Sequence, residues 1–337
     1  MFNSLSLYAL CAFGLSFVGT YLARRYALSR HLLDIPGERS SHLNETPRGG
    51  GVAVVLGVLV TLPLLFMNQL DEGYFWALWG GGLMIALVGY WDDHVSLPAK
   101  VRFALQLLLA VAVLWVLGGE VGLGFLRTVG LEWAAPPLVV LGLVWWINLF
   151  NFMDGIDGLA SSEGVFVLGG ASVFLALSGA GFWVEVAAVA VAAVAGFLCW
   201  NWAPAKIFLG DVGSYFIGYF IAIFALISLN LHLLPVWVWL VLTALFWVDA
   251  TYTLLVRMNR GQRWYQPHRS HAYQIAARRL QSHAKASLIA SAVNLFWLFP
   301  LAALCFYFRN YGPVIALIAV MPLVFVAWRL NAGIANS

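Results

Sequence analysis

Long apolar segments recur along the whole chain, and they limit what it can fold into more than any other feature. A helix that spans a bilayer needs roughly 20 mostly apolar residues. The sequence offers about eleven such segments. They lie near residues 4–24, 50–68, 74–91, 101–118, 136–152, 164–179, 181–200, 213–230, 234–256, 286–308 and 312–331. The sequence therefore predicts an all-α polytopic membrane protein.

The composition excludes the soluble alternatives. Of the 337 residues, 62% are hydrophobic and 10% are charged, whereas a typical soluble domain is about 45–50% apolar and about 25% charged. The mean hydropathy is +0.87. An ordinary soluble enzyme, a disordered protein and a nucleic-acid-binding domain are excluded, because so little charge cannot cover a water-soluble globule. No connection exceeds about 30 residues, so residues 1–337 are expected to form a single integral-membrane domain.

The placement of the basic residues predicts the orientation in the membrane. With the N-terminus on the periplasmic side and the C-terminus in the cytoplasm, the inner connections are 25–49, 92–100, 153–163, 201–212 and 257–285. Of the 18 Lys and Arg residues, only Arg127 and Arg309 then lie on the outer side. This asymmetry follows the positive-inside rule. The N-terminal segment lacks a basic leader and is expected to be a retained helix.

Five aspartates lie in the inner connections, close to the ends of the apolar segments. They are Asp92, Asp93, Asp154, Asp157 and Asp211. A carboxylate beside apolar membrane sequence is energetically expensive. Any one of them could simply cap a helix. Five in short, glycine-punctuated connections on one face favour a functional site.

The first two acidic connections have a spacing that suits cation binding. Asp92 and Asp93 are adjacent and repel each other unless a cation or a proton lies between them. In NLFNFMDGIDGLA, two amides and two carboxylates recur at every third position, and residues three apart are neighbours on a helix. These four are Asn148, Asn151, Asp154 and Asp157. Oxygens in such a row can hold a hard cation or a sugar hydroxyl.

The third acidic connection, NWAPAKIFLGDVGS, places Asp211 between Gly210 and Gly213. Asp211 could hold a metal while the following backbone N–H groups meet a phosphate at the helix N-terminus. Lys206 adds a cation, and the Phe208 ring could stack on a base. The sequence therefore predicts a metal and phosphate site here.

Two basic connections complete the predicted site. His268 and His271 flank Arg269 in PHRSHAY, a combination that suits phosphate contact or proton transfer. The 25–49 connection contributes Arg39, His42 and Arg48. Together these residues describe an acidic centre, surrounded by cations, at the inner leaflet. Such a centre suits Mg²⁺, which is usually held by one or two carboxylates together with substrate phosphates.

The motifs YWDD, NLFNFMDGIDGLA, PAKIFLGDVGS and PHRSH, in this order, resemble those of the polyprenyl-phosphate N-acetylhexosamine-1-phosphate transferases, the MraY and WecA superfamily. The resemblance covers residues 34–275. It implies a bundle of ten or eleven helices with an active-site groove at the cytoplasmic face of the bacterial inner membrane. The implied reaction moves a sugar 1-phosphate from a UDP-N-acetyl sugar to undecaprenyl phosphate, with Mg²⁺ as cofactor, for which Mn²⁺ can substitute. A homodimer is a further expectation, and no nucleic acid is expected as a partner.

The resemblance and the connections described above together assign three sets of residues. The catalytic set is Asp92, Asp93, Asn151, Asp154, His268 and His271. The substrate-binding set is Arg39, His42, Arg48, Asn148, Asp157, Asn201, Lys206, Phe208 and Arg269. The metal set is Asp211 and Asp92. Which of Asp92 and Asp93 serves as the base, and whether the transfer takes one step or passes through an aspartyl-phosphate, stays open.

One segment predicts the branch of the family. The PHRSHAYQ form is most similar to the enzymes that initiate O-antigen or related surface-polysaccharide synthesis (WbpL-like), and it lacks the histidine run of the peptidoglycan branch. The donor sugar would then be GlcNAc, FucNAc or a relative. The alternative function is a secondary transporter of a phosphorylated metabolite, which would place ionisable groups near the bilayer midplane.

Overall fold

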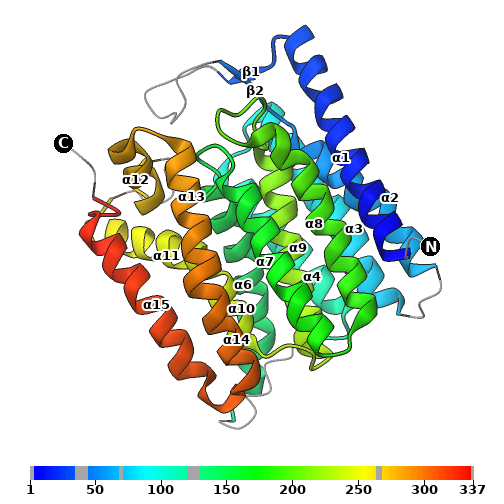
Figure 1. The fold of residues 1–337 in the computed structure, drawn as a ribbon, viewed down its shortest axis with the longest axis vertical. Helices are drawn as coiled ribbons and strands as arrows, with labels where there is room; N and C mark the ends of the chain where they lie inside the picture. The colour runs from blue at the N-terminus through cyan, green and yellow to red at the C-terminus, as the bar shows by residue number, and fades with distance from the viewer. Residues whose placement is uncertain (1–3, 35–44, 68–70, 120–129, 263–267, 335–337) are drawn as a thin grey trace.

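The computed structural model describes residues 4–34, 45–67, 71–119, 130–262 and 268–334, and these residues form a bundle of helices (Figure 1). The long helices run side by side, with α1 at one edge, α15 at the opposite edge and α9 between them. The first half comprises α1 (Ser4–Ser29), α2 (Gly51–Phe66), α3 (Glu72–Val95), α4 (Ala99–Val116), the 3₁₀ turn η1 (Glu132–Ala134), α6 (Ala135–Phe152) and α7 (Leu159–Leu177). The second half comprises α8 (Gly181–Asn201), α9 (Gly210–Asn230), α10 (Val236–Leu242), α11 (Ala244–Asn259), α12 (Ala272–Leu280), α13 (His283–Val293), the π-helical turn η2 (Asn294–Leu298), α14 (Phe299–Tyr307), the 3₁₀ turn η3 (Arg309–Tyr311) and α15 (Gly312–Arg329).

Every apolar segment predicted from the sequence overlaps a helix. Within the described ranges, nine helices are long and apolar enough to cross a membrane, and α2 is shorter. The segment predicted over 234–256 is helical but broken: α10 and α11 meet at a bend of 73°, and α11 runs across the bundle (Figure 1). The break lies at Thr243, whose hydroxyl donates to the carbonyl of Trp239 (2.7 Å). Such a bond competes with the helical backbone pattern.

Helix α9 forms the core of the bundle and carries Asp211 in its first turn. It packs against α2, α3, α6 and α7. Of the residues in its most apolar 18-residue stretch, 83% are buried. Close approach to α3 depends on Gly89, because a Cβ at that position would lie 2.5 Å from the Asp211 carbonyl oxygen. Asp93 lies four residues after Gly89, on the same face of α3. Packing of the two helices therefore brings Asp93 and Asp211 together.

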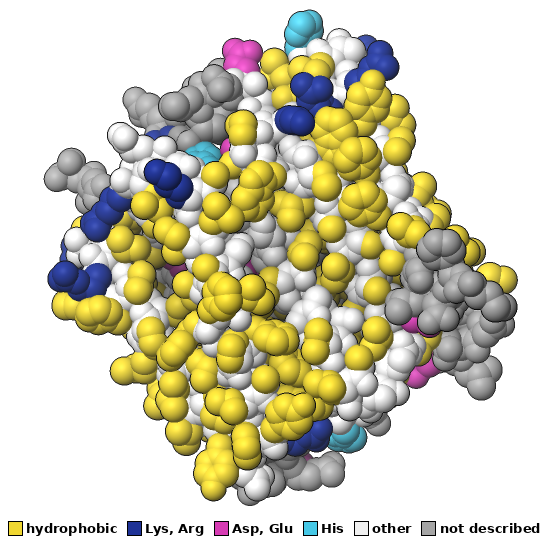
Figure 2. All heavy atoms as spheres, in the orientation of Figure 1, with side chains coloured by type: hydrophobic (Ala, Val, Ile, Leu, Met, Phe, Trp, Pro, Cys, Tyr) yellow, Lys and Arg dark blue, Asp and Glu magenta, His cyan; other side chains and the backbone are white. Residues whose placement is uncertain are grey.

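The outer surface of the bundle is apolar over its middle. Figure 2 shows hydrophobic side chains covering the central part of the visible face, with most basic side chains gathered towards its upper and left edges. Trp115 and Phe296 are among the exposed large side chains. An apolar surface of this extent would be a liability in water and suits contact with lipid. The chain is thus a multi-pass membrane protein.

A short two-stranded sheet and helix α12 lie at one end of the bundle (Figure 1). Strands β1 (Leu33–Asp34) and β2 (Thr46–Pro47) pair antiparallel, with Asp34 opposite Thr46. The backbone N–H of Phe208 donates to the Pro47 carbonyl (2.8 Å), which joins β2 to the connection before α9. This end of the molecule carries the candidate site.

Candidate active site

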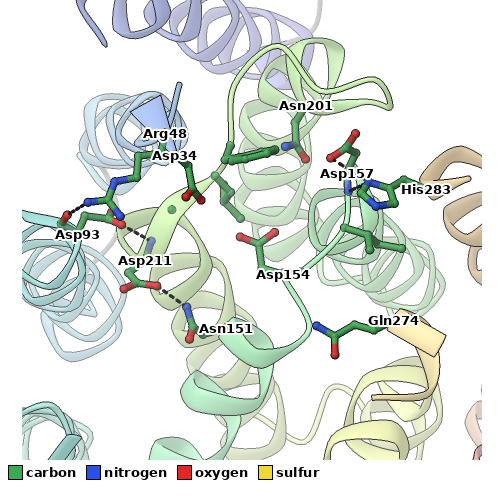
Figure 3. Close-up of a pocket in the computed structure, with 15 residues that line it drawn as sticks. Asp34, Arg48, Asp93, Asn151, Asp154, Asp157, Asn201, Asp211, Gln274 and His283 are labelled. Atoms are coloured by element: carbon green, nitrogen blue, oxygen red, sulfur yellow. Dashed lines mark hydrogen bonds and ion pairs between the residues drawn. The ribbon is translucent and has the colours of Figure 1, made fainter. Parts of the chain in front are cut away.

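A cavity of about 400 Å³ opens between the ends of α3, α6, α8 and α9, and we call it the carboxylate pocket (Figure 3). Its lining residues are Asp34, Arg48, Asp93, Asn151, Asp154, Gly155, Ile156, Asp157, Asn201, Phe208, Leu209, Gly210, Asp211, Gln274 and His283. Three of the acidic connections predicted from the sequence converge here. Five aspartates face one arginine and one histidine, so the lining carries an excess of negative charge.

Asp93 caps helix α9 from the neighbouring helix. Its two carboxylate oxygens accept hydrogen bonds from the N–H groups of Asp211 (3.0 Å) and Val212 (3.1 Å). A carboxylate at a helix N-terminus is favoured by the helix dipole. Gly210 has φ +76°, and a Cβ there would lie 2.8 Å from Asp93 Oδ2, so glycine is needed at this turn. The expectation that these N–H groups meet a substrate phosphate is wrong for these two, because Asp93 already occupies them.

Asn151 orients the side chain of Asp211. Its Nδ2 donates to Asp211 Oδ1 (2.7 Å) and to Ser214 Oγ (2.9 Å). The amide therefore holds one carboxylate oxygen of Asp211, while the side chain remains on the pocket lining (Figure 3). Arg48 donates to the backbone carbonyl of Asp93, which places a cation at the edge of the pocket.

Asp154 points into the pocket, opposite Asp211 (Figure 3). Among the described residues, no hydrogen bond or ion pair reaches its carboxylate. Burial, followed by repulsion from Asp211, Asp93 and Asp157, raises the pKa of Asp154 well above its usual value. A carboxylate in this setting lacks the compensation that buried charges normally have.

The donor set of the pocket fits a hard divalent cation that binds together with its substrate. Over the ranges that the structure describes, no three His, Cys, Asp or Glu side chains are arranged closely enough to hold a metal by themselves. Mg²⁺ needs fewer protein ligands than that, since it is commonly held by one or two carboxylates and by substrate phosphates. Asp211 and Asp154 are suitable oxygen donors for such a cation.

Asp157 and Asn201 fix the connections around the pocket. Asp157 accepts the N–H of Ala205 at Oδ2 (3.0 Å), and its Oδ1 lies 3.2 Å from His283 Nδ1. Asn201 Oδ1 accepts from the Gly158 N–H (3.2 Å) and the Ser161 hydroxyl (3.0 Å). Asn201 Nδ2 also donates to the Ile207 carbonyl (3.1 Å). These bonds hold the DGIDGLA connection against the connection that precedes α9.

A second cavity of about 600 Å³ adjoins the carboxylate pocket, and we call it the α12–α13 pocket. Its lining residues are Thr46, Asp157, Ala203, Pro204, Ala205, Phe208, Gln274, Ala277, Arg278, Gln281, Ser282, His283 and Ala284. Phe208 lines both cavities, and its stacking on a base stays a prediction.

Three predicted residues lie outside the lining of both cavities. Asp92 is buried and paired with Arg102 (3.0 Å), and it also accepts from the Tyr215 hydroxyl (2.8 Å). Asn148 donates to Gln106 on α4. Lys206 is exposed, with Nζ 5.3 Å from the centre of the Trp200 ring. The structure therefore gives each of these side chains a partner away from the pocket.

Residues 268–271, the described part of the PHRSH segment, do not line the carboxylate pocket either. His271 is buried, with Nδ1 3.3 Å from Asp249 Oδ1, and its ring stacks on His268. Burial first, and then the neighbouring His271 and Arg257, lower the pKa of His268 to about 3. The expectation that His268, Arg269 and His271 face the pocket aspartates is wrong for the described structure. The acidic partner of His271 is Asp249, on helix α11.

The segment still reaches the site through helix α12. Asp249 accepts the N–H groups of Ala272 and Tyr273 (both 2.9 Å) at the start of this helix. The Tyr273 hydroxyl donates to the Phe152 carbonyl (2.9 Å), between Asn151 and Asp154. Gln274, one residue further along, lines both cavities.

Sequence reasoning missed three polar side chains of the lining and named two residues that cannot be placed. Asp34, Gln274 and His283 line the carboxylate pocket. The serine–histidine pair before α13 is the available signal for His283, since Ser282 caps that helix. Arg39 and His42 lie outside the described residues. Arg48, predicted with them, does line the pocket.

The sequence is similar to those of several known proteins. The profile of glycosyl transferase family 4 matches residues 75–229. A probable undecaprenyl-phosphate N-acetylglucosaminyl 1-phosphate transferase of Bacillus subtilis is 33% identical over 261 residues, which are 75% of this chain and 72% of that protein. An undecaprenyl-phosphate alpha-N-acetylglucosaminyl 1-phosphate transferase of Yersinia pestis is 29% identical over 274 residues (77% and 73%). A phospho-N-acetylmuramoyl-pentapeptide-transferase of Chlorobaculum parvum is 29% identical over 249 residues (64% and 65%).

Proposed function

The chain belongs to glycosyl transferase family 4, within the MraY and WecA superfamily, and on that premise we propose that it transfers an N-acetylhexosamine 1-phosphate from a UDP-sugar to undecaprenyl phosphate. The observation that carries the proposal is the carboxylate pocket. In it, Asp154 and Asp211 face each other at the end of a membrane-embedded bundle. A nucleotide-sugar from the aqueous side and a lipid phosphate from the bilayer can both reach such a place.

The reaction exchanges one pyrophosphate bond for another. An oxygen of the lipid phosphate attacks the phosphorus that carries the sugar, and the bond from that phosphorus to UMP breaks. The second pKa of a phosphate monoester is about 6, so the nucleophile needs little help from a base. Catalysis then consists mainly of positioning and charge neutralisation. Mg²⁺, held by Asp211 and Asp154, would supply the neutralisation when bound.

The protein's own residues supply the positioning. Asp93 fixes the first turn of α9, and Asn151 fixes the side chain of Asp211. Arg48 stands at the edge of the pocket, where its guanidinium can neutralise a phosphate oxygen. Both carboxylate oxygens of Asp93 are bonded to backbone N–H groups, so we assign Asp93 a positioning role and not that of a base.

The orientation and the branch of the family are parts of the same proposal. The positive-inside rule supports an N-terminus outside the bacterial inner membrane and a pocket at its cytoplasmic face. The PHRSHAYQ segment supports a first membrane step in O-antigen or similar surface-polysaccharide synthesis, with GlcNAc or FucNAc as the donor sugar. The transporter alternative gains no support from the relatives, which are named as transferases.

UMP release by the purified protein in detergent tests the proposal. UDP-GlcNAc, UDP-GalNAc and UDP-FucNAc are supplied separately, with undecaprenyl phosphate and Mg²⁺, and each reaction is repeated without the lipid. The expected result is UMP that forms only when the lipid is present, and the most active donor identifies the sugar. Absence of UMP with every donor, from protein shown to be folded, would overturn the proposal for these three sugars.

A further inference from the structure

The carboxylate pocket and the α12–α13 pocket share a wall. Asp157, Phe208, Gln274 and His283 line both cavities. The two cavities are therefore adjoining parts of one larger site, and a ligand longer than either part must pass these four side chains. A nucleotide-sugar is such a ligand, since its diphosphate separates a nucleoside from a sugar.

His283 stands at this wall because of the way helix α13 begins. Ser282 caps the helix, its hydroxyl accepting the N–H of Lys285 (3.2 Å), so His283 is held at the first helical position. There its Nδ1 lies 3.2 Å from Asp157 Oδ1 and 3.5 Å from the Asp157 backbone N. The side chains of His283 and Asp157 are 18% and 13% exposed, so both keep a surface towards the cavities.

Helix α13 is fixed to the segment around Asp157 at two further points. The Ser287 hydroxyl donates to the Asp157 carbonyl (2.9 Å). Further along, Asn294 Nδ2 donates to Glu163 Oε2 (2.6 Å), and both side chains are buried. His283 and Ser287 are four residues apart and share a helix face. Of these three side chains, only His283 lines the cavities, so the other two hold the helix and His283 meets the ligand site.

We propose that His283 is a positioning residue of the donor site, which holds the Asp157 carboxylate at the wall where the nucleotide-sugar crosses from one pocket to the other. The inference rests on the proposed function. His283 lies beyond residues 34–275, the part of the chain that carries the family motifs. With the Ala205 N–H on Oδ2 and His283 on Oδ1, both oxygens of Asp157 are fixed in direction.

The α12–α13 pocket suits the donor better than the lipid acceptor because of where it lies. Its lining residues come from α12, the first turn of α13, strand β2 and the connections at Asp157 and 203–208, and none comes from the middle of a membrane-spanning helix. Arg278, Gln281 and Ser282 add charged and hydrogen-bonding groups to a lining that also contains alanines and Phe208. A polyprenyl chain would instead need a wall formed by the membrane-spanning helices, because it lies in the bilayer. A change at His283 should therefore alter binding of the donor and leave binding of the acceptor unchanged.

The test compares His283→Ala, His283→Asn and Ser291→Ala in the full-length protein in detergent. Ser291 lies on the same helix and lines neither cavity. Its hydroxyl donates to the Ser287 carbonyl one turn earlier (2.9 Å), so Ser291→Ala is the matched control. Calorimetry measures binding of UDP without lipid or sugar transfer. Steady-state assays then give kcat and the KM of each substrate.

We expect His283→Ala to weaken UDP binding and to raise the donor KM roughly tenfold, the usual effect of losing a hydrogen bond to a charged group. The KM for undecaprenyl phosphate should stay within about twofold. His283→Asn should recover most of the loss, because its side-chain amide carries both a donor and an acceptor with which to bond Asp157. Ser291→Ala should behave as wild type.

Two results would overturn the inference. Unchanged UDP binding by His283→Ala would remove His283 from the donor site. An equal rise in both KM values, with a lower melting temperature and no rescue by Asn, would mean that His283 only supports the fold. Calorimetry measures UDP binding without turnover, so the two proposals can fail separately. If the wild type is inactive, the proposed function is refuted. The comparison of UDP binding by wild type and His283→Ala still decides the role of His283.

Discussion

Two aspartates near helix ends, Asp154 in the carboxylate pocket and Asp249 on α11 beside the His268–His271 segment, have opposite surroundings. Asp154 receives no hydrogen bond from the described residues and faces other carboxylates (Figure 3). Asp249 accepts from Ala272, Tyr273 and Thr253 and pairs with His271. A buried charge with a full set of partners, such as Asp249, supports the scaffold, whereas a carboxylate on a cavity lining without such partners, such as Asp154, is free to bind a ligand. The contrast separates the reacting part of the molecule from the part that holds it.

Removal of the divalent cation should have the largest effect on activity, because it acts on the carboxylate pocket and not on Asp249. If the pocket carboxylates await Mg²⁺, excess EDTA should abolish UMP release completely, and added Mg²⁺ should restore it. Mn²⁺ should restore it in part, because it accepts the same oxygen ligands. Mg²⁺ should also raise the melting temperature, since a ligand that binds only the folded state stabilises it. Full activity in excess EDTA would contradict the assignment of the pocket as a cation site.

Asp211→Asn tests the same region through a single side chain. We expect kcat to fall roughly 10³-fold, the size of effect seen when a group that stabilises developing charge is removed. The melting temperature should hold or rise, because the substitution relieves repulsion among crowded carboxylates while Asn151 can still donate to the remaining carbonyl oxygen. UMP release and thermal unfolding are measured on the same preparations.

The outcome for Asp211→Asn has two parts that can fail separately. Near-normal turnover would show that Asp211 is not the principal metal ligand. A large loss of stability would show instead that Asp211 belongs to the scaffold, as Asp249 does, and the contrast between the two regions would disappear.

The sequence predicts the membrane helices well and their interruptions poorly. A spanning segment is recognised from composition along one dimension, and every predicted segment overlaps a helix. The Thr243 hydroxyl bonds the Trp239 carbonyl at the break, but Thr20 and Thr61 make the same bond inside helices that continue. Nothing in the hydropathy of 234–256 distinguishes the two cases.

The residues of the candidate site could be predicted where they belong to a short sequence motif. Asp93, Asn151, Asp154 and Asp211 converge as their motifs imply. Asp92 does not, because consecutive residues on a helix point in directions about 100° apart. Asp93 therefore faces α9, while Asp92 faces Arg102 and Tyr215. The contribution of His283 depends on how α13 packs against the connection at Asp157, which no local pattern encodes.

Asp249→Asn tests the other side of the contrast. The substitution removes a charge from a carboxylate that accepts two backbone N–H groups, and it turns one acceptor oxygen into an NH₂ group facing a donor. We expect a loss of about 2 kcal/mol of stability, typical of hydrogen bonds to a charged group. Activity should fall by less than for Asp211→Asn, roughly tenfold, through displacement of α12 and Gln274.

The measurement for Asp249→Asn is thermal unfolding alongside kcat and donor KM. Thr253→Val is the matched control, since it removes one weaker donor to the same carboxylate (3.1 Å). An unchanged melting temperature with turnover as low as in Asp211→Asn would place Asp249 in the reacting region and refute its role as a scaffold group.

Lys206→Ala should have the smallest effect, and it tests whether lining the pocket is the right criterion for membership of the site. The sequence places Lys206 beside Asp211 among the substrate-binding residues, but the structure leaves it exposed over Trp200 (5.3 Å). A cation–π contact at an exposed position is worth about 0.5–1 kcal/mol, so the donor KM should change by less than about twofold. Arg48→Ala is the comparison, because Arg48 lines the pocket and bonds Asp93, and its donor KM should rise roughly tenfold. A tenfold rise in the donor KM of Lys206→Ala would mean that this side chain moves to contact the bound donor. The 203–206 turn would then belong to the reacting part of the molecule.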